Sequence, residues 1–323
     1  MSHIVFLDRN SLSRTTLIPE IASPHSWQDY ASTRPDEVIE HCKNATVVVL
    51  SKVPITDQVL AACPAIRHIA VAATGFNIVD LNACRRRGIS VSNVPSYAST
   101  SVSEHVINMA LSLRRELIQY RQQVIDGAWQ TSAGFCLFDK PVNDLAGSTM
   151  GIIGFGEIGQ ATARLAHALG MKIVFSARRP MRSGFAKQLD FAELITTADI
   201  ISLHCSLNDS TRNLISSGEL NDMQKHAILI NTARGGIVDE PALVNALQTR
   251  QIAGIGIDTL LEEPPKDDSP LLQIAGLTNV IITPHSAWLS QQAMQKLADI
   301  LADNINGFLS GKPQNLVGLN KTN

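Results

Sequence analysis

The sequence is poor in aromatic residues and has neither a marked excess of charge nor a long apolar run. Aromatic side chains make up 5% of its 323 residues, and 27 Lys and Arg stand against 29 Asp and Glu, for a formal net charge of −2. Without a basic excess to neutralise phosphates, no nucleic-acid partner is expected. Near the N-terminus the only apolar run is Ile4–Leu7, far short of a signal peptide or a membrane-spanning helix. We therefore expect a soluble globular protein with no membrane partner.

Cysteine is scarce and scattered. The five cysteines are odd in number and lie far apart in the sequence, at Cys42, Cys63, Cys84, Cys136 and Cys205. They lack the close Cys and His spacing of a zinc site, so no metal is expected. Such cysteines are typical of free thiols in a reducing compartment, and we expect a cytoplasmic protein.

Short apolar runs alternate with longer amphipathic stretches along the whole chain, which predicts α/β units with parallel sheets. At roughly 100–200 residues per domain, the length predicts two domains. The strands expected in the first are His3–Asp8, Thr46–Leu50, Ile66–Ala73 and Ile89–Asn93, with helices at Pro35–Lys43 and Asp57–Cys63. The strands expected in the second are Thr149–Gly154, Lys172–Phe175, Ile200–His204, Ala227–Asn231, Gly254–Asp258 and Val280–Thr283.

Two longer helices flank the second series of strands. In the first, apolar residues recur at helical spacing on two faces, with Val102, Val106, Met109, Ala110, Leu113 and Leu117 on one and Ile107, Leu111 and Ile118 on another. A helix that is apolar on two faces must be covered on two sides, which favours a homodimer. The second helix is marked by Met294, Leu297, Leu301, Ile305 and Phe308 and ends at Gly311 and Pro313.

A glycine-rich loop opens the second series. The segment Gly154-Phe155-Gly156-Glu157-Ile158-Gly159 follows an apolar strand and begins an amphipathic helix, the context that a dinucleotide-binding G-x-G-x-x-G loop requires. The first glycine permits a tight turn, the second lets the backbone approach a pyrophosphate, and the third lets helix and strand pack closely. The helix N-terminus would face the phosphates. A tight turn without a ligand is the alternative, but the context favours a nicotinamide dinucleotide.

The residues after the next expected strand indicate which dinucleotide it is. NAD-binding chains usually carry Asp or Glu about twenty residues after the glycines. Here the segment Ser176-Ala177-Arg178-Arg179-Pro180-Met181-Arg182 contains no carboxylate. Because arginine suits a 2′-phosphate, NADP(H) is expected as the preferred cofactor, with NAD(H) possible. A solvated basic loop is the alternative explanation.

Three further segments follow strands of the second series, where ligands bind in open α/β sheets. They are Asn231-Thr232-Ala233-Arg234-Gly235-Gly236, Asp258-Thr259-Leu260-Leu261-Glu262-Glu263-Pro264 and Thr283-Pro284-His285-Ser286-Ala287-Trp288. Each alone could be a surface arginine, an acidic loop or a histidine in a turn. In this order, together with the glycine loop and Ser103-Glu104-His105, they resemble the D-isomer-specific 2-hydroxyacid dehydrogenases, and within them the glycerate dehydrogenase and hydroxypyruvate reductase group.

The resemblance implies roles for three residues. Arg234 would bind the carboxylate and carbonyl of the substrate, His285 would be the general acid and base, and Glu263 would pair with His285. Glu262 is the rival for the glutamate, but the family's glutamate directly precedes a proline, as Glu263 does. These residue types suit the reduction of a 2-oxo acid, which needs a hydride, a proton for the carbonyl oxygen and a fixed cation for the carboxylate.

The resemblance also implies a fold of two Rossmann-like, doubly wound parallel-sheet domains with the active site between them. The smaller, flavodoxin-like domain would be discontinuous, made of residues 1–98 and 287–323, and would bind substrate. Residues 99–286 would bind the dinucleotide. Besides the glycine loop, the expected cofactor contacts are Arg178, Arg179, His204, Cys205, Thr232, Ala233 and Asp258. Besides Arg234 and His285, the expected substrate contacts are Lys52, Thr74, Gly75 and Trp288.

The expected reaction is hydride transfer to small 2-oxo acids, from hydroxypyruvate to D-glycerate or from glyoxylate to glycolate. A dehydrogenase of another 2-hydroxy acid, such as D-lactate, is the nearer alternative. A nucleotide-sensing binding protein similar to the family's transcriptional co-repressors is the remote one.

Overall fold

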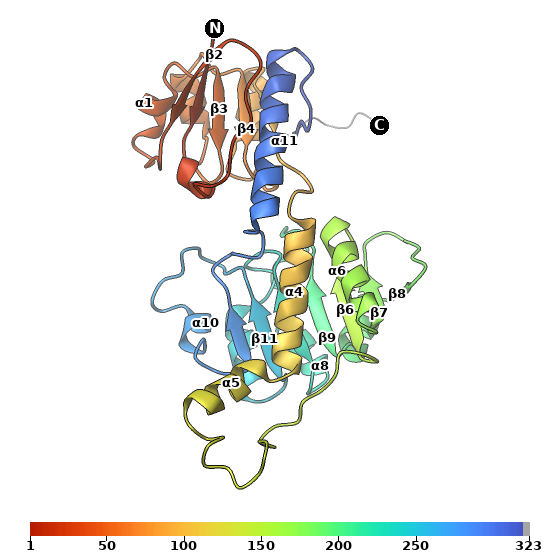
Figure 1. Ribbon diagram of the computed structural model, residues 1–323. Helices are drawn as coiled ribbons and strands as arrows, with labels where there is room; N and C mark the ends of the chain where they lie inside the picture. The colour runs from red at the N-terminus through yellow and green to blue at the C-terminus, as the bar shows by residue number, and fades with distance from the viewer. Residues whose placement is uncertain (319–323) are drawn as a thin grey trace. The chain divides into compact units, whose positions relative to one another are not determined.

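The computed structural model describes residues 1–318, which form two compact units (Figure 1). Unit 1 contains Met1–Ala98 and the residues from Leu289 onward, whereas unit 2 contains Ser99–Trp288. Unit 1 is therefore discontinuous. The boundary drawn from the sequence placed the return of the chain at residue 287, two residues before Leu289.

Unit 1 is built on a parallel sheet of strand order β2-β1-β3-β4-β5, the flavodoxin-like order. Its strands are β1 (Ser2–Phe6), β2 (His25–Asp29), β3 (Val47–Leu50), β4 (His68–Val71) and β5 (Ser90–Ser92). Its helices are η1 (Arg9–Ser11), α1 (Val38–Cys42), α2 (Asp57–Ala62), α3 (Leu81–Arg86) and α11 (Gln291–Leu309). Alternate strand residues such as Val48 and Ile69 form a core with α1, α2 and α3 on one face. On the other face α11 packs against β4, and Phe308 stacks on the imidazole of His68.

Unit 2 is built on a larger parallel sheet of order β12-β11-β10-β9-β6-β7-β8. Its strands are β6 (Thr149–Ile153), β7 (Lys172–Ser176), β8 (Ala186–Gln188), β9 (Ile200–Leu203), β10 (Ile228–Asn231), β11 (Gly254–Ile257) and β12 (Val280–Ile282). Its helices are α4 (Ser99–Arg114), α5 (Leu117–Ile125), α6 (Glu157–Ala168), α7 (Phe191–Thr197), α8 (Ser217–Asp222), α9 (Glu240–Gln248) and α10 (Pro270–Gln273). In residues 1–318 no helix combines the length and the apolar character needed to cross a membrane.

The strands of unit 2 are apolar on both sides because both faces of the sheet are covered. One core contains Met150, Ile152 and Phe175 and lies beneath α4 and α6. The neighbouring residues along the same strands, such as Ile153 and Val174, belong to a second core with α7, α8, α9 and α10. Figure 1 shows α4 and α6 lying side by side across the first face. The two units are thus doubly wound α/β folds, which confirms the fold class expected from the sequence.

Ten strands predicted from apolar runs are confirmed, with ends shifted by two residues or fewer. The two strands that were not predicted, β2 and β8, are edge strands with half-exposed or exposed residues, so no apolar run marks them. The single helix expected from Val102 to Leu117 was wrong. It is interrupted at Glu116, whose φ of 51° is left-handed, and α5 begins at Leu117. The sheet and α6 cover most of the apolar residues of α4, Ile107 among them, whereas Leu111 of the second face is 38% exposed.

Candidate active site

The strand order of unit 2 reverses between β6 and β9, and the glycine loop lies at this point. In open α/β sheets the ligand crevice forms at the carboxyl ends of the strands at such a reversal. Gly154 follows β6 and has a φ of +94°, and a Cβ atom added to it would lie 2.7 Å from the backbone nitrogen of Cys205, just after β9. Only glycine therefore allows the two strand ends to approach so closely.

The other two glycines of the loop differ in what surrounds them. A Cβ atom on Gly159 would collide with the carbonyl oxygen of Gly154, so this glycine serves the packing of helix on strand. A Cβ atom on Gly156, the N-cap of α6, would meet no protein atom within 4 Å. The open space lies at the positive end of a twelve-residue helix, where an anion is stabilised. The loop therefore fits the pyrophosphate of a dinucleotide.

The remaining residues of the glycine loop are held in place by contacts within the protein. The ring of Phe155 is buried and stacks on Phe175 at 3.8 Å between centroids, so Phe155 can present only its backbone to a ligand. Glu157 accepts a hydrogen bond from the hydroxyl of Ser99 at 2.6 Å, which ties the first turn of α6 to α4. Ile158 is half-buried in the same turn.

Arg178 and Arg179 follow β7, one strand away from the glycine loop. Both side chains are exposed, and within residues 1–318 neither forms an ion pair. Their backbone is fixed by Gln188 of β8, whose amide donates to the carbonyls of Ala177 at 3.2 Å and Arg179 at 3.1 Å. Two guanidinium groups are thus held on an ordered loop at the carboxyl end of β7, where they can take an anion.

Arg234 lies on the turn after β10. The side chain of Asn231 shapes this turn, since it accepts from the nitrogen of Ala233 at 3.0 Å and donates to the carbonyl of Arg234 at 2.9 Å. A Cβ atom on Gly235 would collide with the carbonyl of Leu260, so glycine lets this turn pack against the loop after β11. The guanidinium of Arg234 is exposed and donates to the carbonyl of Ala233 at 2.7 Å, which leaves other donors for a ligand.

Glu263 and His285 form a pair. Nδ1 of His285 lies 2.7 Å from Oε2 of Glu263, and Oε1 of Glu263 accepts from the nitrogen of Leu260 at 3.0 Å. The rival glutamate, Glu262, pairs instead with Lys266 at 2.8 Å. Because a carboxylate only accepts, Nδ1 of His285 carries the hydrogen and Nε2 is the nitrogen left for a substrate. The preference for Glu263 over Glu262 as the partner of His285 is thus met by the geometry.

Asp258 is buried and hydrogen-bonded to the turn that follows β12. Its carboxylate is 1% exposed and accepts from the hydroxyl of Thr283 and from the backbone nitrogens of Ser286 and Ala287. It therefore holds the turn that carries His285. Sequence reasoning did not identify Thr283 as its partner, because 25 residues separate the two and no local pattern links them.

The remaining cofactor candidates surround the same strand ends. Burial lowers the pKa of His204 to about 4, and Nε2 of its ring bonds the hydroxyl of Ser202 at 2.9 Å. Burial raises the pKa of the half-buried Cys205 thiol. The buried hydroxyls of Thr232, which was predicted, and of Thr259, which was not, have no hydrogen-bond partner within the described residues. Such buried hydroxyls are rare in folded proteins, so each is available to a water or a ligand.

In unit 1 the predicted substrate residues follow β3 and β4. Asp8, after β1, is buried and accepts from the nitrogens of Ser51 at 2.8 Å and Lys52 at 2.6 Å, so it fixes the backbone beneath the exposed Lys52 side chain. The hydroxyl of Thr74 donates to the carbonyl of Val94 at 2.9 Å. Burial raises the pKa of Asp8, against the hydrogen bonds that lower it. Asp8 was missed because the sequence placed it inside the expected strand His3–Asp8, whereas β1 ends at Phe6.

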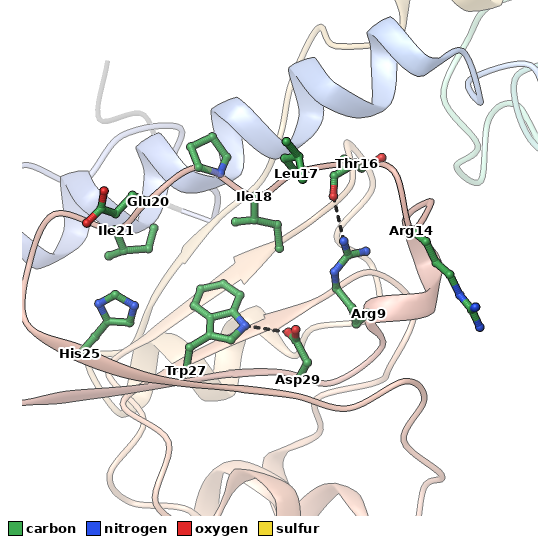
Figure 2. Close-up of a pocket in the computed structure, with 11 residues that line it drawn as sticks. Arg9, Arg14, Thr16, Leu17, Ile18, Glu20, Ile21, His25, Trp27 and Asp29 are labelled. Carbon is green, nitrogen blue, oxygen red and sulfur yellow. Dashed lines mark hydrogen bonds between the residues drawn. The ribbon is translucent and has the colours of Figure 1, made fainter.

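Trp288, the last residue of unit 2, is half-buried and lies three residues beyond His285. A cavity of about 380 Å³ lies elsewhere, in unit 1, between β2 and residues 14–21 (Figure 2). Two of its polar side chains are engaged within the chain, since Arg9 donates to the carbonyl of Thr16 and Trp27 donates to Asp29. None of the residues expected in the active site lines this cavity. Among the described residues no group of three His, Cys, Asp or Glu side chains could hold a metal ion.

Comparison with known proteins identifies the family. The NAD-binding domain of D-isomer specific 2-hydroxyacid dehydrogenases matches residues 107–287. A glycerate dehydrogenase of Methylorubrum extorquens is 45% identical over 315 residues, which cover 97% of this chain and 98% of that protein. The chain belongs to the D-isomer specific 2-hydroxyacid dehydrogenase family. It is an oxidoreductase that acts on 2-hydroxy acids and binds a nicotinamide cofactor.

Two further relatives of this 2-hydroxyacid dehydrogenase show the range of the family. A hydroxypyruvate reductase of Blautia hydrogenotrophica is 36% identical over 285 residues, 87% of this chain and 88% of that protein. A solved acyclic imino acid reductase, Bsp5, in complex with NADPH and D-Arg has a TM-score of 0.85 at 28% identity and covers 98% of this chain and 99% of its own. The dehydrogenase resembles these proteins along nearly its whole length, so both units belong to the family fold.

Proposed function

We propose that this dehydrogenase reduces small 2-oxo acids, with hydroxypyruvate and glyoxylate as its substrates and D-glycerate and glycolate as the products. The observation that carries the proposal is the 2.7 Å contact between His285 and Glu263, on a loop that neighbours the Arg234 turn through Gly235. The relatives named glycerate dehydrogenase and hydroxypyruvate reductase support the choice of substrate. Another acid such as D-lactate is the nearer alternative.

The chemistry follows from the three side chains. The guanidinium of Arg234 binds the substrate carboxylate through parallel hydrogen bonds and draws charge from the neighbouring carbonyl. His285 holds a proton at Nε2 and donates it to the carbonyl oxygen, which becomes the hydroxyl of the product. Glu263 keeps the hydrogen on Nδ1 and stabilises the protonated ring. The nicotinamide cofactor, when bound, supplies the hydride for the carbonyl carbon, or accepts it in the reverse direction.

We propose that the preferred cofactor is NADP(H). Arg178 and Arg179 are exposed, form no ion pair within residues 1–318, and follow β7, where a chain that prefers NAD would place a carboxylate. One or two charged hydrogen bonds to a 2′-phosphate, each worth about 1.5–3 kcal/mol, can discriminate by tens- to hundreds-fold. The other cofactor residues proposed are those of the glycine loop together with His204, Cys205, Thr232 and Ala233. Asp258, which also holds the His285 turn, is proposed as a further cofactor residue.

Unit 1 is proposed as the substrate-binding domain, with Lys52, Thr74 and Gly75 as contacts of the 2-oxo acid. Support comes from their position, since they follow β3 and β4 at the carboxyl ends of the sheet of unit 1. Trp288 is proposed to narrow the site and to disfavour bulky acids. A cytoplasmic location also remains a prediction, supported by the free cysteines at Cys42, Cys63, Cys84, Cys136 and Cys205.

A homodimer is proposed on two grounds, of which the first is the apolar second face of α4, where Leu111 is 38% exposed. The arm, defined as residues 126–143, follows α5 and extends away from the sheet of unit 2 (Figure 1). It exposes Phe135 and Phe138, at 88% and 87%, next to the exposed Trp129 and to Ile125 of α5. Its backbone is held by Tyr120, whose hydroxyl donates to the carbonyl of Lys140 at 2.9 Å. Several exposed apolar side chains on one segment are typical of a protein interface, and a second copy of the chain is the partner proposed.

The function is tested by steady-state kinetics with hydroxypyruvate, glyoxylate, pyruvate and phenylpyruvate, each with NADPH and with NADH. We expect hydroxypyruvate and glyoxylate to have the highest kcat/KM and phenylpyruvate the lowest. His285→Ala is expected to lower kcat by roughly 10²–10⁴-fold, the usual worth of a positioned acid. Comparable kcat/KM for phenylpyruvate and hydroxypyruvate would contradict the small-substrate proposal, and no turnover of any acid would favour a nucleotide-sensing binding protein.

A further inference from the structure

A hydrogen-bond chain connects helix α4 to the turn that carries His285. Nε2 of His105, on α4, lies 3.1 Å from Oγ1 of Thr283. The hydroxyl of Thr283 in turn donates to Oδ1 of Asp258 at 2.5 Å. Since a hydroxyl has one hydrogen, Thr283 must accept from His105, and Nε2 of His105 must carry a hydrogen. The chain therefore runs in one direction, from His105 through Thr283 to Asp258.

Asp258 accepts several hydrogen bonds from the turn that carries His285. Besides the bond from Thr283, its carboxylate accepts from the nitrogens of Ser286 at 2.8 Å and Ala287 at 3.1 Å. Its backbone carbonyl accepts from the nitrogen of His285 at 3.0 Å. A buried carboxylate is costly unless it is hydrogen-bonded, so each of these donors contributes to keeping Asp258 charged inside the protein.

The backbone of His285 needs this support. Its φ of 52° lies in the left-handed region, which is uncommon for a residue with a Cβ atom and persists only where surrounding contacts fix it. Helix α4 makes a second contact with the turn, because the hydroxyl of Ser101 donates to the carbonyl of Ala287 at 2.6 Å. The turn is thus held from α4 at its beginning by His105 and at its end by Ser101.

His105 has the protonation state that this arrangement needs. Its side chain is 19% exposed, and its Nε2 lies 3.8 Å from Oδ1 of Asp258. Burial lowers the pKa of His105, although the charge of Asp258 acts in the opposite direction. The neutral ring can still donate from Nε2, so Thr283 keeps its donor when His105 is uncharged.

We propose that His105 is a positioning residue of this dehydrogenase, which acts through Thr283 and Asp258 to hold His285 in its left-handed turn against Glu263. The proposal rests on the proposed role of His285 as the proton donor. It assigns a role in the reaction to a helix residue that contacts neither of the two side chains it positions.

The test compares substitutions that keep the donor with substitutions that remove it. His105→Gln keeps an N–H near the position of Nε2, and His105→Leu removes it. Thr283→Ser keeps the hydroxyl, and Thr283→Val removes it. Asn108→Leu, an exposed position on the same helix, is the matched control. Each variant is assayed with the best 2-oxo acid of the parent for kcat, KM and the cofactor Kd, and its melting temperature is recorded.

We expect His105→Leu and Thr283→Val each to lower kcat by about 10- to 100-fold, the loss that a small misplacement of a reacting group causes. KM and the cofactor Kd should change by less than about threefold, and the double variant should be no worse than either single one, because both act through one chain. His105→Gln, Thr283→Ser and Asn108→Leu should keep kcat within about threefold of the parent. An equal loss of kcat in His105→Gln and His105→Leu, or losses that add in the double variant, would overturn the proposal.

A second readout does not depend on activity. In protein labelled with ¹⁵N-histidine, the Nδ1 proton of His285 bonded to Glu263 should give a downfield signal that disappears in His285→Ala. We expect this signal to be lost in His105→Leu and kept in His105→Gln. A signal that is unchanged in His105→Leu would refute the positioning role, even if the parent reduced none of the acids tested. If the signal is lost in His105→Leu alone and the parent still reduces none of these acids, the positioning role is supported and the proposed substrates are wrong.

Discussion

Glu263 holds His285 with one carboxylate oxygen and its own loop with the other. Oε2 lies 2.7 Å from Nδ1 of His285, and Oε1 accepts from the nitrogen of Leu260 at 3.0 Å. The carboxylate is therefore fixed in direction before any substrate arrives, which pre-organises the proton donor. The pair is about 30% exposed, with side-chain exposures of 28% for His285 and 32% for Glu263, so water moderates its strength.

Glu263→Gln is expected to shift the pH profile of reduction. Without its anionic partner, the protonated ring of His285 loses the charge that stabilises it, so the reductive rate should be lower than in the parent, most of all at the alkaline end of the profile. The measurement is kcat/KM for hydroxypyruvate between pH 5 and 9. Glu262→Gln is the matched control, because Glu262 pairs with Lys266 and should leave the profile in place. A profile unchanged in Glu263→Gln would remove this residue from the proton transfer.

Arg178→Ala is expected to narrow the preference for NADPH. The loss of one charged hydrogen bond, about 1.5–3 kcal/mol, should raise the KM for NADPH by tens-fold and leave that for NADH nearly unchanged. Ala177→Asp combined with Arg178→Ala should invert the preference, because a carboxylate repels the 2′-phosphate and accepts from the ribose hydroxyls. Lys172→Ala, a cation at the opposite end of β7, is the control. Equal kcat/KM for the two cofactors in the unmodified protein would show that these arginines lie on a solvated loop and do not select the cofactor.

Substitutions of two glycines around the site should distinguish an effect on cofactor binding from an effect on folding stability. In Gly156→Ala the new methyl group meets no protein atom, so the melting temperature should fall little while the cofactor Kd rises by more than about tenfold. In Gly235→Ala the methyl group would collide with the carbonyl of Leu260, so the protein itself should be destabilised by several kcal/mol. Calorimetry and cofactor titration measure the two effects. Unchanged cofactor affinity in Gly156→Ala would show that the space above this glycine is not the pyrophosphate site.

The arm should control the oligomeric state. Replacing Phe135 and Phe138 together by Ser removes two of the most exposed apolar side chains and is expected to yield a folded monomer. Sedimentation velocity of the parent and of the variant measures this. Leu17→Ser, an exposed leucine in unit 1, is the control and should remain a dimer. A monomeric parent, or a dimer in the double variant, would contradict the proposed interface.

His68 predicts a loss of stability on acidification. Burial lowers its pKa from 6.5 to about 4, so the folded protein stays unprotonated where the unfolded chain binds a proton. Its contribution is fully present above pH 6.5 and is lost as the pH falls towards 4, by about 3 kcal/mol in total. His68→Gln should flatten part of this slope in urea unfolding between pH 7.5 and 4. His25→Gln, at a half-exposed histidine of the same unit, is the control. If the unfolding free energy of His68→Gln changes with pH as steeply as that of the parent, His68 is not the cause of the loss.

The sequence was most informative where structure depends on neighbours in the chain. The turn at Gly154, the close packing at Gly159 and the strand runs are local features, and they were predicted with their positions. The edge strands β2 and β8 were missed, because they contain half-exposed residues such as Trp27 and exposed ones such as Lys187, and so no apolar run. The break at Glu116 was missed because nothing in the sequence prevents the helix from continuing there.

Contacts between distant residues could not be predicted in the same way. Asp258 was assigned to the cofactor, and its hydrogen bonds to the turn that starts 25 residues later were not foreseen. The apolar faces of α4 predicted that the helix is covered on two sides, and α6 supplies part of that cover within the chain. Periodicity shows that a face is buried but not which element buries it. The pairing of Glu263 with His285 was anticipated because the family resemblance, and not the spacing alone, connected them.

Because unit 1 is discontinuous in the sequence, it can finish folding only after unit 2 has been synthesised. The buried Asn304 of α11 donates to the carbonyl of Asn93 at 2.8 Å, and Leu297 and Leu301 are fully buried. The first hundred residues therefore cannot complete their fold when they leave the ribosome, because one face of their sheet stays uncovered until α11 has been synthesised. Unit 2 has all its elements earlier and can fold while unit 1 is still open. A chaperone that shields apolar surface would be needed by the earliest part of the chain, and a truncation before α11 would leave unit 1 aggregation-prone.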